Sequence, residues 1–89
     1  MQTHSNECLP KLTISRRPDV LSRFGIGNTC LHSRIKEGLI PPSISLGGRS
    51  VGWLDHELDQ VMAAMVAGKS KDQIKMLVDQ LVDQRKLVA

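Results

Sequence analysis

Four side chains that can form hydrogen bonds recur at helical spacing in the segment 28–37. They are Thr29, His32, Ser33 and Lys36. On a helix that turns by about 100° per residue they fall within about 100° of one another, and Leu31 and Ile35 fall on the opposite side. Side chains of these types reach base edges and phosphates in the major groove of DNA. The pattern therefore predicts a face that reads DNA, and the alternative is the solvated face of a short surface helix.

Other candidate contacts to DNA surround this segment. Asn28 lies at its N-terminal rim, where backbone amides and the helix dipole favour a phosphate. Arg49 follows two glycines, so we expect it at the tip of a hairpin, where it can reach a phosphate or the minor groove. Three arginines around the preceding segment can straddle the DNA backbone, although each can equally be an ordinary solubilising charge. They are Arg16, Arg17 and Arg23.

The positive charge is concentrated in the first half of the chain. Seven basic and two acidic residues between Lys11 and Trp53 give +5, whereas five basic and six acidic residues between Leu54 and Ala89 give −1. Glu7 supplies the remaining −1 of the net charge of +3. A polyanion such as double-stranded DNA is therefore expected to bind the first half.

Several other functions are disfavoured by what the sequence lacks. Phe24 and Trp53 are the only aromatic residues, too few for the stacking platforms of modules that bind single-stranded nucleic acid. No dinucleotide-binding, P-loop or HExxH motif occurs, and the three histidines and two cysteines do not have metal-ligand spacing. We therefore expect no enzyme activity, no catalytic residues, no cofactor and no metal site.

The composition also indicates a cytoplasmic protein. No apolar run approaches the roughly 20 residues that a membrane span requires. The segment from Met1 to Pro10 has neither the basic cluster nor the apolar core of a signal peptide. Cys8 and Cys30 are far apart and form no CxxC pair, so we expect them to be reduced thiols.

Two short helices joined by a tight turn are predicted to position the candidate residues. The first begins near Pro18, which is a favourable first-turn residue, and ends at Gly25. The second has Gly27 or Asn28 as its N-cap and ends at Gly38. Two short helices with a glycine-containing turn of about three residues between them are typical of a helix-turn-helix.

A β-hairpin and a third helix are predicted next. The segments 43–46 and 50–53 alternate small or polar residues with apolar ones, and two glycines lie between them. The third helix is expected to run from Asp55, as its N-cap, to Gly68. Trp53, at the junction, is expected to be a core residue that joins the hairpin to this helix.

A fourth helix is predicted from Lys71 to Lys86. Ser70 and Gln73 form an S-x-x-Q capping box at its start. Its apolar stripe falls at i, i+3, i+4, i+7 and i+8. The stripe consists of Ile74, Leu77, Val78, Leu81 and Val82. It can fold back onto the core of the domain or form a dimer interface.

Together these elements predict a mainly α fold with a small β-hairpin. We expect a flexible leader at 1–15, with a short extended piece at 12–14, and a winged helix-turn-helix DNA-binding domain at 16–68. The last part, 69–89, is expected to be an extra C-terminal amphipathic helix.

A specific combination of short patterns runs from residue 21 to Trp53. The patterns are a Leu-x-x-x-Gly-Ile turn at 21–26, the helix end Ile35-Lys36-Glu37-Gly38, Ile40-Pro41, Leu46-Gly47-Gly48-Arg49, and Trp53 before an acidic helix. With them, the chain resembles the AlpA family of prophage regulatory proteins, relatives of the MerR-like excisionases, over roughly 17–67. The chain differs at Gly27 and His32, where the family usually has a Ser or Thr cap and an aromatic residue, so the family's base preference is not carried over.

The resemblance implies a MerR-like winged helix-turn-helix that binds DNA near integrase genes or attachment sites. Members activate transcription of integrase or excision genes, or act as excisionases that shape DNA for an integrase. The recognition helix would be 28–37 and the wing arginine Arg49. Integrase is thus a second expected partner, and a homodimer or cooperative assembly on DNA is left open. Two other hypotheses remain: an adaptor that binds proteins through its last two helices, and an antitoxin-like DNA-binding repressor.

Overall fold

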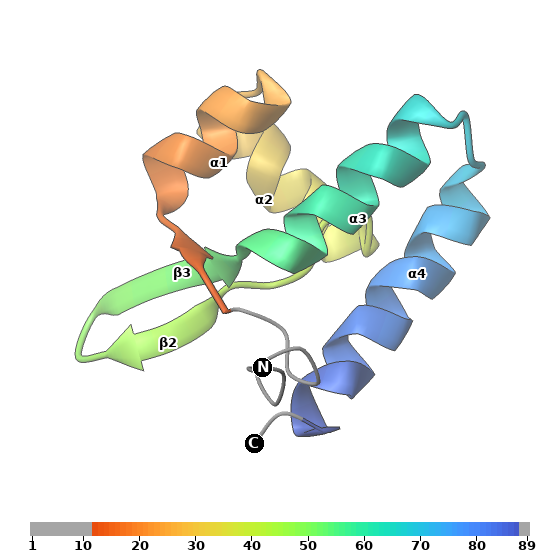
Figure 1. Ribbon diagram of the computed structural model, residues 1–89. Coiled ribbons are helices and arrows are strands. Elements are labelled where there is room, and N and C mark those ends of the chain that lie inside the picture. The colour runs from red at the N-terminus through yellow and green to blue at the C-terminus, as the bar shows by residue number, and fades with distance from the viewer. Residues whose placement is uncertain (1–11, 88–89) are drawn as a thin grey trace, which may run out of the picture.

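The computed structural model describes residues 12–87, which form helices around a small sheet (Figure 1). The elements in chain order are β1 (Ile14–Ser15), α1 (Arg17–Phe24), α2 (Asn28–Glu37), β2 (Ile44–Gly47), β3 (Ser50–Leu54), α3 (Asp55–Val66), α4 (Lys71–Gln84) and the short 3-10 helix η2 (Arg85–Leu87). The predicted fold class is confirmed, because four α-helices accompany a small antiparallel sheet in the arrangement of a winged helix-turn-helix.

The helix-turn-helix is formed by α1 and α2. Pro18 lies in the first turn of α1, and α1 ends at Gly25, whose φ of 66° is left-handed. The backbone N–H of Ile26 donates to the carbonyl of Leu21 at 3.0 Å, which closes the turn. Gly27 is the N-cap of α2, and Gly38, with φ 82°, ends it. Both predicted helices are therefore present with their predicted ends.

The sheet has three strands, one more than the sequence predicted. The hairpin of β2 and β3 forms as expected, and β1 pairs antiparallel with the other edge of β3. Ile14 lies opposite Leu54, and Ser15 lies opposite Trp53. The leader predicted at 1–15 therefore contributes its last two residues to the sheet, and residues 1–11 lie outside the described part of the chain.

The start of α3 corrects one prediction. Leu54, not Asp55, is the N-cap, because β3 runs into α3 with no residue between them. The N–H of Asp55 donates to the carbonyl of Thr13 at 2.9 Å, and its carboxylate accepts a hydrogen bond from the hydroxyl of Ser15. Asp55 therefore ties the start of α3 to β1 instead of capping the helix.

The capping box predicted for α4 is present. The N–H of Gln73 donates to the Ser70 hydroxyl at 3.2 Å, and the N–H of Ser70 donates to the Gln73 side chain at 2.9 Å. The helix then lies beside α3 (Figure 1). The buried part of its apolar stripe packs against Val61 of α3 within the same chain, and comprises Ile74, Val78 and Leu81. The regular helix ends at Gln84, two residues before the predicted end.

The main core joins the helix-turn-helix, the hairpin and α3. Its buried members are Val20, Leu31, Ile40, Trp53 and Leu58. The Trp53 indole N–H donates to the carbonyl of Pro41 at 3.0 Å, which satisfies the only polar atom of this buried side chain. Trp53 is thus the core residue that the sequence predicted.

None of the helices in the described range 12–87 combines the length and the apolar character needed to cross a bilayer.

Candidate DNA-binding surface

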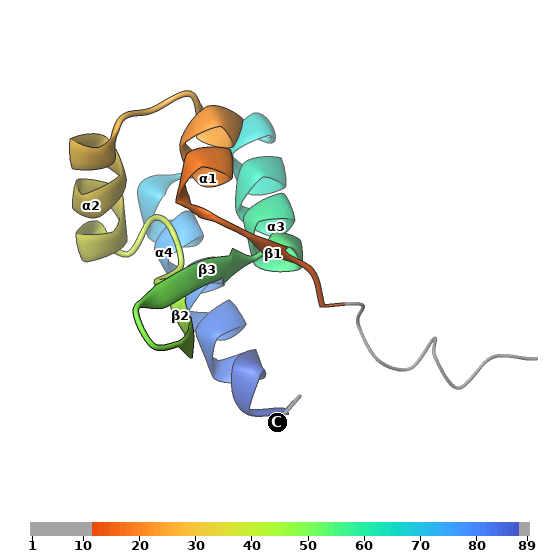
Figure 2. The same ribbon diagram turned by 90° about the vertical axis from the view of Figure 1, so that its left-hand side faces the viewer.

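The helix α2 buries one face and presents the other to solvent. Leu31 is fully buried, and Ile35 packs partly buried against the same core. On the opposite face, all four predicted base-reading residues are exposed: Thr29, His32, Ser33 and Lys36. In Figure 2, α2 lies at the edge of the molecule with α1 between it and α3. The exposed face is therefore not covered by α4 or by any other described element.

The first turn of α2 has backbone amides without a capping side chain. Its N-cap is Gly27, in an extended conformation with φ −95° and ψ 176°, and no side chain of the cap accepts a hydrogen bond from the helix. The first turn also contains no acidic residue. Because free amides and the positive end of the helix dipole lie here, this end of α2 favours an anionic group.

Arg17 connects three elements next to this helix end. Its guanidinium carbon lies 5.5 Å from the centroid of the Trp53 ring, and its Nη1 donates to Oδ1 of Asn28 at 3.4 Å. Arg17 is half-buried, and Asn28 is exposed. The structure therefore brings these two predicted residues together, at the point where α1, the hairpin and α2 meet.

Arg16 lies along the hairpin. Its Nε donates to the carbonyl of Val51 on β3 at 3.0 Å, and the side chain is exposed. This hydrogen bond places a second positive charge against β3 of the hairpin.

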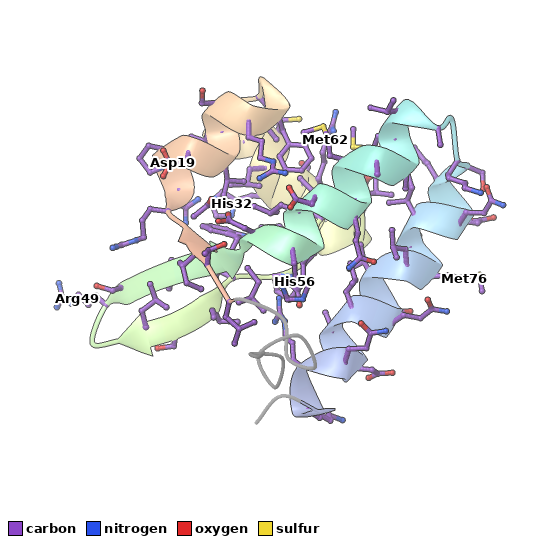
Figure 3. All side chains as sticks on the ribbon, in the orientation of Figure 1. Asp19, His32, Arg49, His56, Met62 and Met76 are labelled. Carbon is purple, nitrogen blue, oxygen red and sulfur yellow. The ribbon has the colours of Figure 1, made fainter. Side chains whose placement is uncertain are left out.

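Arg49 lies at the outer end of the hairpin. Figure 3 shows its side chain at the tip, away from the helices. Gly47 and Gly48 shape the turn, with φ values of 107° and 55° that other residues rarely adopt. The turn therefore holds an exposed arginine at the end of a short arm, as the sequence predicted.

Arg23 is the one predicted residue that the structure places elsewhere. It forms an ion pair with Asp59 of α3. In Figure 2, α3 lies on the other side of α1 from α2. The two residues are 36 positions apart in the chain, so no local sequence pattern indicates this pair. This partly exposed ion pair directs Arg23 toward α3.

The described residues show no arrangement for metal chemistry. Across 12–87, no three side chains of His, Cys, Asp or Glu come together in a way that could hold a metal ion. The surface consists instead of hydrogen-bonding residues on one helix, flanked by arginines from α1 and the hairpin. Such a surface suits a polyanion whose bases present hydrogen-bonding groups at their edges.

Two comparisons with known proteins found similar sequences. The family model described as the prophage CP4-57 regulatory protein (AlpA) matches residues 13–66, from just before β1 to the end of α3. The uncharacterized protein ORF88 of Enterobacteria phage P4 is 35% identical to the chain over 66 residues, which are 71% of this chain and 75% of ORF88. No solved structure matches the chain.

Proposed function

Because this chain belongs to the AlpA family of prophage regulatory proteins, we propose that it is a sequence-specific DNA-binding regulator of a prophage or integrative element. The observation that carries this proposal is the exposed polar face of α2. A helix of this kind, held against its predecessor by a buried leucine and backed by a positive flank, fits the major groove of B-DNA.

In this proposal the contacts divide into two groups. The exposed residues of α2 approach base edges and specify sequence: Thr29, His32, Ser33 and Lys36. The free amides at the start of α2, with Asn28 and Arg17, approach a phosphate, and Arg49 reaches a phosphate or the adjacent minor groove. Arg23 is left out of the proposal because it is paired with Asp59.

A selection experiment tests the proposal. The protein is used to enrich duplexes from a random library about two helical turns long, and the enriched duplex is compared with a scrambled one by mobility shift. Ser33→Ala and Lys36→Ala are each expected to change which duplexes are enriched. Lys69→Ala, in the exposed loop before α4, serves as the control and should leave the enriched set unchanged. Failure of the wild-type protein to enrich any duplex would falsify the proposed function.

The regulatory role follows from where the preferred sequence lies. We propose that the protein acts in the cytoplasm, with double-stranded DNA as its partner, either as an activator of integrase or excision genes or as an excisionase that assembles with an integrase. A preferred site upstream of an integrase gene, with increased transcription from it, supports the activator role. Excision of the element in a reaction of purified integrase, DNA and this protein supports the excisionase role.

The adaptor hypothesis has less support. An adaptor that used the apolar stripe of α4 would need it free for a partner, whereas Ile74, Val78 and Leu81 are buried against α3. The same packing weakens the idea of a dimer formed through this stripe. We propose instead that any assembly of several copies takes place on DNA. Counting the shifted species as protein is titrated onto the enriched duplex in a mobility-shift experiment measures this.

A further inference from the structure

The linker between the recognition helix and the hairpin contains two adjacent prolines. Pro41 and Pro42 lie between the end of α2 and the start of β2, so their placement sets the position of the hairpin relative to α2. Proline has no backbone N–H, so such a segment can be held by backbone hydrogen bonds only through its carbonyl groups. Both carbonyls are used: Pro41 accepts from Trp53 Nε1 at 3.0 Å, and Pro42 accepts from Arg85 Nη2 at 2.8 Å.

Arg85 reaches the linker from the far end of the chain. It is the first residue of η2, directly after α4, and lies 43 positions from Pro42. Its Nε donates to Oε2 of Glu57 at 2.9 Å, and its Nη2 donates to Oε1 of Glu57 at 2.6 Å. The Glu57 side chain is only 1% exposed, and that of Arg85 is 20% exposed. A guanidinium group held by two parallel bonds to a buried carboxylate has a fixed orientation.

The same Nη2 therefore joins α3 to the linker. Because Glu57 fixes the plane of the guanidinium group, the hydrogen bond to the Pro42 carbonyl has a defined direction as well as a defined length. The Trp53 indole holds the neighbouring carbonyl from the side of β3. The linker is thus held at two successive carbonyls, by groups from the hairpin and from the C-terminal segment.

We propose that Arg85 is a positioning residue for DNA recognition, which fixes the hairpin relative to α2 through the Pro42 carbonyl. This inference rests on the proposed function. The family model matches residues 13–66, so Arg85 lies outside the segment that defines the family, whereas both of its partners lie inside it. The C-terminal segment of this chain therefore acts on the spacing of two DNA-contacting elements without touching DNA itself.

A role in stability alone makes a different prediction. A buried ion pair contributes little net stability, and replacing both partners with apolar residues of similar volume is often neutral. If Arg85 serves only to stabilise the fold, the double variant Glu57→Met/Arg85→Met should bind DNA as the wild type does once it is folded. If Arg85 positions the linker, the same variant should fold and still lose discrimination between DNA sequences.

The experiment compares affinities for the enriched duplex and a scrambled duplex of equal composition. One variant is Arg85→Lys, which keeps the charge near Glu57 but replaces the planar two-nitrogen fork with a single nitrogen on a shorter side chain. The other is the double variant. The ratio of the two affinities is expected to fall by about tenfold in both, comparable to the loss of one base-pair contact. Ile74→Val, at the other end of α4, is a control that lowers stability through core packing and should keep the wild-type ratio.

The outcomes separate this inference from the proposed function. Binding is measured at a temperature where thermal unfolding curves show each variant to be folded. A loss of folded protein then does not affect the ratio of affinities for the enriched and the scrambled duplex. If the wild type enriches a duplex and both Arg85 variants keep its ratio, the positioning role is wrong and the proposed function stands. If the wild type enriches no duplex, the proposed function is wrong and this inference is wrong with it.

Discussion

The guanidinium group of Arg17 covers the ring of Trp53, with 5.5 Å between the guanidinium carbon and the ring centroid. Trp53 is almost fully buried in the core, whereas Arg17 is the first residue of α1 and also donates to Asn28, the first residue of α2. A single side chain therefore connects the core of the hairpin with the beginnings of both helices of the helix-turn-helix.

Removing this connection should affect both folding and DNA binding. Arg17→Met is expected to lower the free energy of unfolding by about 1 kcal/mol, because a cation–π contact and a hydrogen bond are lost. It should also weaken binding to every duplex, because a positive charge next to α2 disappears. Urea unfolding followed by the fluorescence of Trp53, the only tryptophan, measures the first effect. Arg17→Lys should give an intermediate loss, and an unfolding curve of Arg17→Met identical to that of the wild type would contradict the prediction.

The tip of the hairpin should contribute charge without sequence preference. If about five phosphates are neutralised, the slope of log affinity against log salt concentration should be near −4 to −5. Arg49→Ala is expected to weaken binding to all sequences and to make this slope shallower by about one. Ser33→Ala should leave the slope unchanged, since a neutral side chain releases no counterion. Equal slopes for Arg49→Ala and the wild type would show that Arg49 does not contact a phosphate.

The stability of the fold should depend on the ionisation of Asp55. The hydrogen bond from Ser15 is the main reason that the pKa of Asp55 lies below its ordinary value; a hydrogen bond from Thr13 and the charge of Arg23 act in the same direction, and burial opposes them. A carboxylate with a lower pKa in the folded state contributes stability above its unfolded pKa, and that contribution is lost as the pH falls through the folded pKa. The loss should therefore appear below about pH 4.

Asp55→Asn isolates this contribution. The wild type should lose more thermal stability than the variant between neutral pH and about pH 3, because the other carboxylates are common to both proteins. Melting temperatures measured across this range by circular dichroism test the expectation. If the melting temperatures of the wild type and of Asp55→Asn fall in parallel over this pH range, the hydrogen bond from Ser15 does not stabilise the ionised carboxylate of Asp55.

Gly52 should tolerate no side chain, although its backbone conformation is ordinary. A Cβ at this position would collide with Cγ2 of Ile14 and would lie 3.1 Å from Cδ1 of Leu46 and 3.3 Å from the carbonyl oxygen of Ser15. Gly52→Ala is therefore expected to destabilise the fold by about 1–3 kcal/mol, by displacing β1 from β3.

Combining this change with Ile14→Ala provides the control. The second substitution removes the atom that meets the new Cβ, so the double variant should be more stable than the sum of the two single changes predicts. Simple additivity of the unfolding free energies would exclude a direct contact between these positions.

The parts of the fold that depend on neighbouring residues were predictable from the sequence. Gly25 and Gly38 end their helices in left-handed conformations, and Ser70 and Gln73 form their capping box, because these features involve residues only a few positions apart. The exposed face of α2 was predictable for the same reason, since Leu31 and a helical period suffice to orient it.

Features that join distant segments were not predictable in this way. The strand β1 is only two residues long, and its pairing partner lies about 40 positions further along the chain, so no local pattern distinguishes it from an extended leader. Asp55 has the right residue type for an N-cap, but the direct continuation of β3 into α3 shifts the cap to Leu54. The ion pairs of Glu57 with Arg85 and of Asp59 with Arg23 also join distant segments, and no local pattern indicates them.

In the proposed complex with DNA, the direct junction between Leu54 and Asp55 limits how the hairpin can adjust to the duplex. With no loop between β3 and α3, the arm that carries Arg49 continues directly into the helix on this side and has no hinge there. In that complex, a mismatch between the span from α2 to the hairpin tip and the geometry of straight B-DNA would be taken up by curvature of the nucleic acid. Sequences with flexible pyrimidine–purine steps outside the directly contacted bases would be favoured for that reason alone.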